Sequence, residues 1–105
     1  MENTPKCNID KIGTKYWHTE CNLHREDGPA VEYKEGTKEW HVNGKLHRLD
    51  GPAYIRNNGE SEWYINDCDV TSEIYPWAKE NDIDLNNLSN EDINLIKLFW
   101  SDFFY

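Results

Sequence analysis

The feature that most constrains this chain is a stretch of 23 residues that is written twice. Residues 13–35 read GTKYWHTECNLHREDGPAVEYKE and residues 36–58 read GTKEWHVNGKLHRLDGPAYIRNN, identical at 12 positions without a gap. A third copy begins at Gly59 as GESEWYIND and keeps Trp63 and Asn66 in phase before the pattern ends. Repeats of fixed period mark units that bury an apolar face only against a neighbouring unit. The fold is therefore expected to follow the repeat.

Each unit is predicted to consist of short antiparallel strands. Asn43-Gly44 and Asn58-Gly59 are typical of type I′ hairpin turns. The segments between the turns are rich in β-branched and aromatic residues that alternate with polar ones, so we expect an antiparallel β-meander with about two strands per unit. One face is expected to be buried and to carry an aromatic ladder, with a second column of side chains on the opposite face. The ladder is Trp17, Trp40 and Trp63, and the opposite column is His18, His41 and Tyr64.

A helical pattern replaces the turn chemistry after the third copy. Helices are expected over residues 73–80, around Pro76, and from residue 91 to about residue 101, where Ser89 followed by Asp92 matches a capping box. A sheet with one apolar face needs a cover, and the helical segment is the natural one. The prediction is an α+β fold, a β-meander of hairpin repeats capped by a short C-terminal helical segment. It forms a single domain over 1–105, with a lead-in (1–12), a repeat sheet (13–68) and a helical cap (69–105).

The net charge of −9 is unevenly distributed. Residues 1–68 carry 12 acids and 9 bases (−3), whereas residues 69–105 carry 8 acids and 2 bases (−6). Direct nucleic-acid binding is disfavoured because a phosphate backbone requires clustered Lys and Arg. The acidic tail leaves open a mimic of nucleic acid, beside the simpler reading that its charge keeps a small domain in solution. No run approaches the roughly 18 apolar residues of a membrane span, so no membrane partner is expected.

The cysteines and histidines do not indicate a metal or redox site. Cys7, Cys21 and Cys68 are an odd number without a C-x-x-C pair, which indicates free thiols in a reducing compartment. The beginning of the chain lacks a secretory pattern, so we expect a cytoplasmic protein. The four histidines never stand at the spacings of a helical or strand metal pair. Neither a metal nor another cofactor is expected.

The element Leu-His-Arg-x-Asp-Gly-Pro-Ala occurs at 23–30 and again at 46–53. A catalytic set is usually single, whereas a set copied in every unit is more often structural. Arg and Asp two residues apart are well placed for charge-assisted hydrogen bonds that brace the turn. The alternative is that the motif contacts a ligand. The residues that would make these contacts are His24, Arg25, His47 and Arg48.

The longer arrangement Trp-x-x-x-Gly-x-x-His-Arg-x-Asp-Gly-Pro-Ala at 40–53, present at 17–30 with Cys21 in place of the glycine, resembles a repeat found in tandem in bacteriophage and giant-virus proteins. Those repeats are similar in turn to MORN-type hairpin repeats. The resemblance covers residues 13 to about 67, and the tail also resembles the segment that ends such proteins. It implies a viral origin and a repeat sheet, but no reaction. This chain departs from the longer arrays because it has only two full units.

Two functional hypotheses follow. The first is a non-enzymatic interaction protein that binds and inhibits or modulates a host protein, for instance a bacterial defence factor, and an enzyme is not expected because no asymmetric acid, base and nucleophile set is present. Its candidate contacts lie in the tail, where aromatic anchors dominate binding energies, although packing on the sheet stays open for Trp77 and Phe99. The candidates are Trp77, Asp82, Asp84, Phe99, Trp100 and Tyr105.

The second hypothesis is a binding module that sequesters a nucleotide-like small ligand. The His and Arg residues of the repeated motif would contact phosphates, and Trp or Tyr would stack on the base. The open edges of a meander also leave a homo-oligomer open, because unpaired strand edges can pair with another copy.

Overall fold

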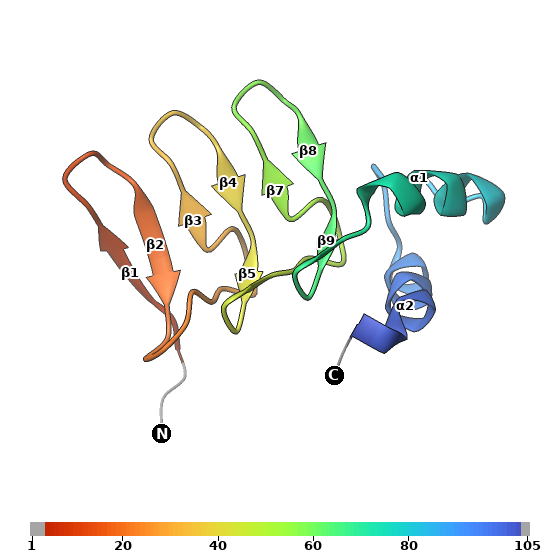
Figure 1. The fold of residues 1–105 in the computed structure, drawn as a ribbon, viewed down its shortest axis with the longest axis horizontal. Coiled ribbons are helices and arrows are strands. Elements are labelled where there is room, and N and C mark those ends of the chain that lie inside the picture. The colour runs from red at the N-terminus through yellow and green to blue at the C-terminus, as the bar shows by residue number, and fades with distance from the viewer. Residues whose placement is uncertain (1–3, 104–105) are drawn as a thin grey trace.

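The computed structural model describes residues 4–103 and has antiparallel β-sheets followed by two α-helices, a mixed α+β fold as predicted (Figure 1). Six strands form the main sheet in the order β1-β2-β3-β4-β7-β8, and two further hairpins, β5–β6 and β9–β10, stand apart from it. The strands are β1 (Lys6–Ile9), β2 (Lys15–His18), β3 (Val31–Glu32), β4 (Lys38–Glu39), β5 (His41–Val42), β6 (Lys45–Leu46), β7 (Tyr54–Ile55), β8 (Ser61–Glu62), β9 (Tyr64–Ile65) and β10 (Cys68–Asp69). They are followed by α1 (Thr71–Glu80), α2 (Asn90–Phe99) and the 3₁₀ turn η1 (Ser101–Phe103).

The main sheet is a row of three hairpins, β1–β2, β3–β4 and β7–β8, that lie side by side and point the same way, with the helices beyond the last one (Figure 1). The predicted lead-in thus contributes a strand, because Lys6 pairs with His18 across β1 and β2. Successive hairpins join through antiparallel pairs such as Lys38 with Ile55. We call residues 6–62 the repeat region and residues 63–103 the helical end.

The strands change partners at Trp40 in the second unit and at Trp63 in the third, so the sheet differs from the single meander that was expected. The Trp40 N–H donates to the Ala53 carbonyl at 2.7 Å, which continues the main sheet. The Trp40 carbonyl accepts from the His47 N–H at 3.0 Å, which opens the separate hairpin β5–β6. The short segments on either side of Trp40 therefore belong to different sheets.

The turns at the ends of the hairpins are of two kinds. Asn43 and Gly44 have φ of 52° and 82°, and this pair of positive values confirms the type I′ turn predicted there. The prediction was wrong for Asn58-Gly59, where Gly59 has φ 93° and Asn58 is not among the positive-φ residues. That turn is longer, because the Arg56 N–H donates to the Glu60 carbonyl at 2.8 Å.

Burial does not follow the predicted aromatic ladder. Trp63 is buried, but Trp17 and Trp40 are only half-buried, and His41 on the opposite column is more buried than Trp40. Among residues 4–103, the large apolar cluster lies in the helical end. It comprises Trp63, Ile65, Val70, Ile74, Trp77, Ala78, Ile96 and Trp100.

Both helices form close to where the sequence predicted them. Helix α1 begins two residues earlier, at Thr71, and contains Pro76 in its interior. The capping box of α2 is confirmed: the Ser89 hydroxyl accepts from the Asp92 N–H, and the Asp92 carboxylate accepts from the Ser89 N–H, both at 3.1 Å. Within residues 4–103, no helix has the length and apolar character that a membrane crossing requires.

Candidate functional site

The repeated motif folds each unit around an arginine that lies on a tryptophan. In the first unit the Arg25 guanidinium carbon is 3.9 Å from the centre of the Trp17 ring. Its Nε donates to the Asp27 carboxylate at 2.8 Å, and its Nη1 donates to the Pro29 carbonyl at 3.1 Å. A cation over an indole is attracted by the ring quadrupole, and the two donors hold the guanidinium in that position.

The second unit repeats this arrangement. The Arg48 guanidinium carbon is 4.0 Å from the Trp40 ring centre, Nε donates to Asp50 at 2.8 Å, and Nη1 donates to the Pro52 carbonyl at 3.0 Å. A Cβ on Gly51 would lie 2.6 Å from the guanidinium carbon of Arg48, so glycine is what allows the backbone to close over it. We call these two sets the arginine clips. They are Trp17, Arg25, Asp27 and Pro29, and Trp40, Arg48, Asp50 and Pro52.

The histidine of each motif joins its unit to the next one. His24 Nδ1 accepts from the Asn43 N–H at 2.9 Å, and His47 Nδ1 accepts from the Asn66 N–H at 3.0 Å. An amide donor opposite Nδ1 requires that nitrogen to be unprotonated. Burial, and to a lesser degree the charge of Lys97, lower the pKa of His47 below its ordinary value, which favours that form.

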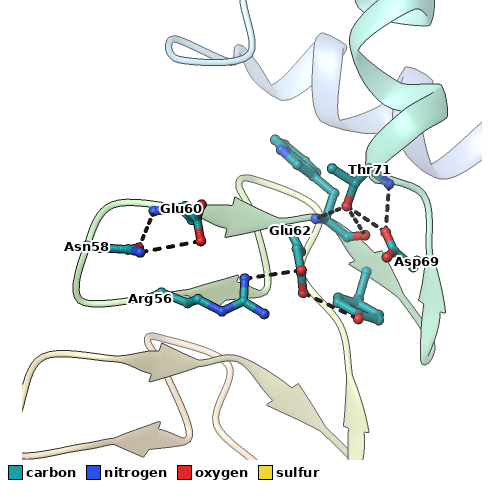
Figure 2. A network of polar contacts seen from close by, with 8 residues as sticks. Arg56, Asn58, Glu60, Glu62, Asp69 and Thr71 are labelled. Atoms are coloured by element: carbon teal, nitrogen blue, oxygen red, sulfur yellow. Dashed lines mark hydrogen bonds and ion pairs between the residues drawn. The ribbon is translucent and has the colours of Figure 1, made fainter.

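The third unit ends the pattern because a threonine stands where the first two units have the arginine of the clip. Thr71 stands 23 residues after Arg48, and its hydroxyl accepts from the Trp63 N–H at 2.9 Å. In the preceding unit the equivalent donor, the Trp40 N–H, bonds the Ala53 carbonyl instead. Asp69 in turn accepts from the Thr71 N–H at 2.9 Å (Figure 2). Because Thr71 also begins α1, the position that carried the clip instead starts the helix that covers Trp63.

A second side-chain contact recurs across the hairpins of the main sheet, but the residue that donates to the glutamate differs between units. The Tyr33 hydroxyl donates to Glu39 at 2.8 Å. At the equivalent positions of the next unit, Arg56 donates to Glu62 at 3.1 Å (Figure 2). His41 also bonds Glu39 at 2.8 Å, and this bond is the main reason why the pKa of Glu39 is lowered. Burial, followed by the Glu39 contact, raises the pKa of Tyr33. The exchange of Tyr for Arg with the bond retained indicates a brace between strands.

Three of the four residues proposed to contact a ligand line one cavity. Arg25, His47 and Arg48 border an open cavity of about 810 Å³ between the two clips and α2, whereas His24 is not among its lining residues. The cavity contains cationic and anionic groups in similar number, since Lys97 adds a charge and three carboxylates face the same space. These carboxylates belong to Glu26, Asp27 and Asp50. Among residues 4–103, no three metal-ligating side chains converge on one point.

The partner-binding candidates are divided between the core and the surface. Trp77 and Trp100 are only 8% and 4% exposed, with ring centres 5.1 Å apart, and this burial favours packing as their role. Phe99 is exposed although its ring touches both, and Asp82 and Asp84 are exposed in the segment between the helices. Tyr105 lies outside the described residues.

Helix α2 presents a second apolar face, and Phe99 is its one residue among the contact candidates predicted from the sequence. Leu95, Leu98 and Phe99 are 46%, 70% and 60% exposed and stand at i, i+3 and i+4, so they form one stripe, which we call the α2 stripe. The core uses the other face through Ile96 and Trp100. The signal was present in the sequence: ten helical residues carry more apolar side chains than one buried face can accommodate.

A groove adjoins the α2 stripe. It has a volume of about 650 Å³, and Phe99 belongs both to it and to the stripe. Pro76 and Trp77 of α1 form its apolar wall, and Glu73 and Glu80 are its two charged lining residues. The arrangement offers an apolar surface bordered by carboxylates.

Comparison of the chain with protein families, with curated proteins and with solved structures found no match.

Proposed function

We propose that this chain is a non-enzymatic, phage-type viral interaction protein that binds a host protein and inhibits or modulates it, in the specific version a factor that counters a host defence. Its repeat region is a MORN-like tandem-hairpin scaffold in this proposal. The proposal draws on the resemblance of the repeated motif and on the division of labour between the repeat region and the helical end.

The observation that carries the proposal is the α2 stripe. Large apolar side chains that are exposed singly need no explanation, but three in one row beside an aromatic groove are typical of a protein contact surface. Leu98 is 70% exposed and Phe99 is 60% exposed, so neither adds much to the core of the chain itself. Both would gain burial from a partner, at roughly 25 cal/mol per Å² of apolar area removed from water.

The repeat region supports a scaffold role. Its motif residues are engaged with their own or the neighbouring unit: Arg25 with Trp17 and Asp27, and His24 with the Asn43 N–H. Side chains that are used to hold a turn in this way support the fold, and this is the role expected of a scaffold.

Site-specific photocrosslinking in bacterial cells tests the proposal. A photoreactive residue at Leu98 is expected to capture a host protein that the same residue at Ile12 does not capture. Ile12 is equally exposed (71%) but lies in the turn between β1 and β2, at the end of the molecule away from the helices (Figure 1). The purified chain should then alter the activity of the captured protein, and Leu98→Asp should abolish that effect. Equal capture from both positions would contradict the proposal.

The second candidate function, sequestration of a nucleotide-like ligand, is favoured by the convergence of Arg25, His47 and Arg48 on one cavity. Its weakness is that both guanidinium groups already bond carboxylates at 2.8 Å. Calorimetry against cyclic di- and trinucleotides distinguishes the two functions. Heat that disappears in Arg48→Gln supports the ligand module, and absence of heat with every nucleotide removes it.

A further inference from the structure

We infer that the partner surface received by the α2 stripe and its groove is an amphipathic helix with Lys or Arg beside its apolar residues. This inference rests on the proposed function and adds the chemistry of the partner. It is carried by the charge around the stripe and by the shape of the surface.

The charge of residues 71–103, the part of the helical end that contains the helices, is not balanced by ion pairs within the described residues. Residues 71–103 contain seven acids and two bases. All six ion pairs found in residues 4–103 join residues between His24 and Glu62, so none of those seven carboxylates takes part in one. The acids are Glu73, Glu80, Asp82, Asp84, Glu91, Asp92 and Asp102.

The carboxylates of the repeat region differ from those of the helical end in their ion pairs. In the repeat region four carboxylates are paired with arginines, as Glu32 is with Arg25 and Glu62 is with Arg56. Carboxylates whose only role was to keep the protein in solution would not need to lie beside an apolar surface. Here Glu73 and Glu80 border the same groove as Phe99 and Trp100, so apolar and acidic groups face one occupant. Complementary charge guides encounter and selects the partner, while the apolar residues supply most of the affinity.

The shape indicates a helix as the occupant. The α2 stripe follows one helix face, and Leu95 and Phe99 are separated by about 6 Å along the axis at 1.5 Å per residue. Ridges of this kind pack into the grooves of another helix, and apolar side chains at i, i+3 and i+4 are the anchors of helix-in-groove recognition. The groove beside Phe99, of about 650 Å³, has room for one large anchor side chain of the partner.

Two synthetic peptides of about 18 residues, roughly five helical turns, test this chemistry with the full chain. Both carry the same leucine stripe, but the polar face is lysine in one and glutamate in the other. By fluorescence anisotropy at about 0.1 M salt, we expect the lysine peptide to bind at least tenfold more tightly than the glutamate peptide, and its binding to weaken as salt rises.

Matched variants locate the binding. Leu98→Ser should weaken binding of the lysine peptide about tenfold, whereas Ile12→Ser should leave it unchanged. The two side chains are equally exposed, but the turn between β1 and β2 and helix α2 lie at opposite ends of the molecule (Figure 1). Glu80→Gln should weaken it about two- to threefold and Glu20→Gln should not, although each removes one exposed charge. Circular dichroism should be unchanged in all four, since each position is exposed.

The outcomes separate this inference from the function on which it rests. Equal binding of both peptides, or equal loss in Leu98→Ser and Ile12→Ser, overturns the basic helix as partner. If the protein captured by crosslinking at Leu98 is not displaced by the lysine peptide, the proposed function stands and the inferred chemistry is wrong. A dimer in sedimentation experiments that Leu98→Ser dissociates assigns the stripe to a second copy of the chain and likewise overturns the inference.

Discussion

The repeat region and the helical end are stabilised in different ways, although the same tryptophan position runs through both. In the repeat region Trp40 is half-buried and its ring is covered by the Arg48 guanidinium, 4.0 Å away. In the helical end Trp63 is fully buried among the side chains of α1 and α2. One region thus uses directed polar contacts around an indole, and the other uses the hydrophobic effect.

The difference arises at the residue eight positions after each tryptophan. Arg48 is long and cationic, and its side chain crosses the Trp40 ring of the same unit to reach Asp50. Thr71 is short, bonds the Trp63 N–H and lets the chain continue as a helix. The side chain at that position therefore decides whether the tryptophan is covered by an arginine of its own unit or by the helices that follow.

The largest test of the comparison is to remove the indole from each region. Trp63→Ala is expected to lower the free energy of unfolding by about 3–5 kcal/mol, the usual cost of a large cavity in a core. Trp17→Ala should cost only about 1–2 kcal/mol, because Trp17 is half-buried and its contact with Arg25 is worth roughly 0.5–2 kcal/mol. Urea unfolding of both variants measures the difference, with Tyr75→Ala as an exposed aromatic control. Equal costs would show that the two regions are stabilised alike.

The arginine clip can be disrupted without touching its charged partners. Gly51→Ala places a Cβ 2.6 Å from the Arg48 guanidinium carbon, and overpacking of this kind should cost about 1–3 kcal/mol. The cost arises only if the guanidinium is held in place. Gly51→Ala made in an Arg48→Ala background should therefore cost much less, and a double-mutant cycle of unfolding free energies detects the coupling. Additive costs would mean that the clip is not the reason for the glycine.

Local features of this fold were predictable from the sequence because they depend on few residues. The Asn43-Gly44 turn follows from two residues that tolerate positive φ, and the start of α2 follows from Ser89 and Asp92. The bracing of the turn by Arg and Asp followed from their spacing, and Arg25 and Arg48 both confirm it.

Features that depend on contacts between units could not be read in the same way. Alternation placed Trp40 on a buried face, but alternation cannot show that the strand changes partners at that residue or that an arginine covers the ring. The candidate contact surface was predicted only in part for the same reason. Trp77 and Phe99 are both aromatic residues of the tail, and tertiary packing alone makes one 8% and the other 60% exposed.

A smaller effect is expected from the cap of α2, which belongs to the helical end. Ser89→Ala removes the acceptor for the Asp92 N–H and should cost about 1 kcal/mol. Ser101→Ala is a suitable control because Ser101 is also exposed and makes no side-chain hydrogen bond within the described residues. The comparison predicts that this loss also weakens binding at the α2 stripe, while Gly51→Ala leaves that binding unchanged once the protein is folded. Peptide binding measured on both variants at a temperature where each is folded decides this point.

The smallest expected effect lies at the junction, where a residue of the repeat region titrates next to a residue of α2. The pKa of His47 lies below its ordinary value of 6.5, first because of burial and then because of Lys97. The unfolded chain therefore binds a proton on His47 more readily than the folded protein does. Stability should be unaffected above about pH 7 and should decrease as the pH falls through 6.5.

Two comparisons assign this pH dependence. Lys97→Gln should reduce the decrease, because it removes one of the two causes of the lowered pKa, and His47→Gln should remove it. Glu39 responds in a separate window, because its lowered pKa makes its contribution decline only below its ordinary value of 4.5. Urea midpoints measured between pH 8 and pH 5 therefore leave out the window in which Glu39 contributes. An unchanged slope in Lys97→Gln would mean that the repeat region and the helical end are electrostatically independent at this contact.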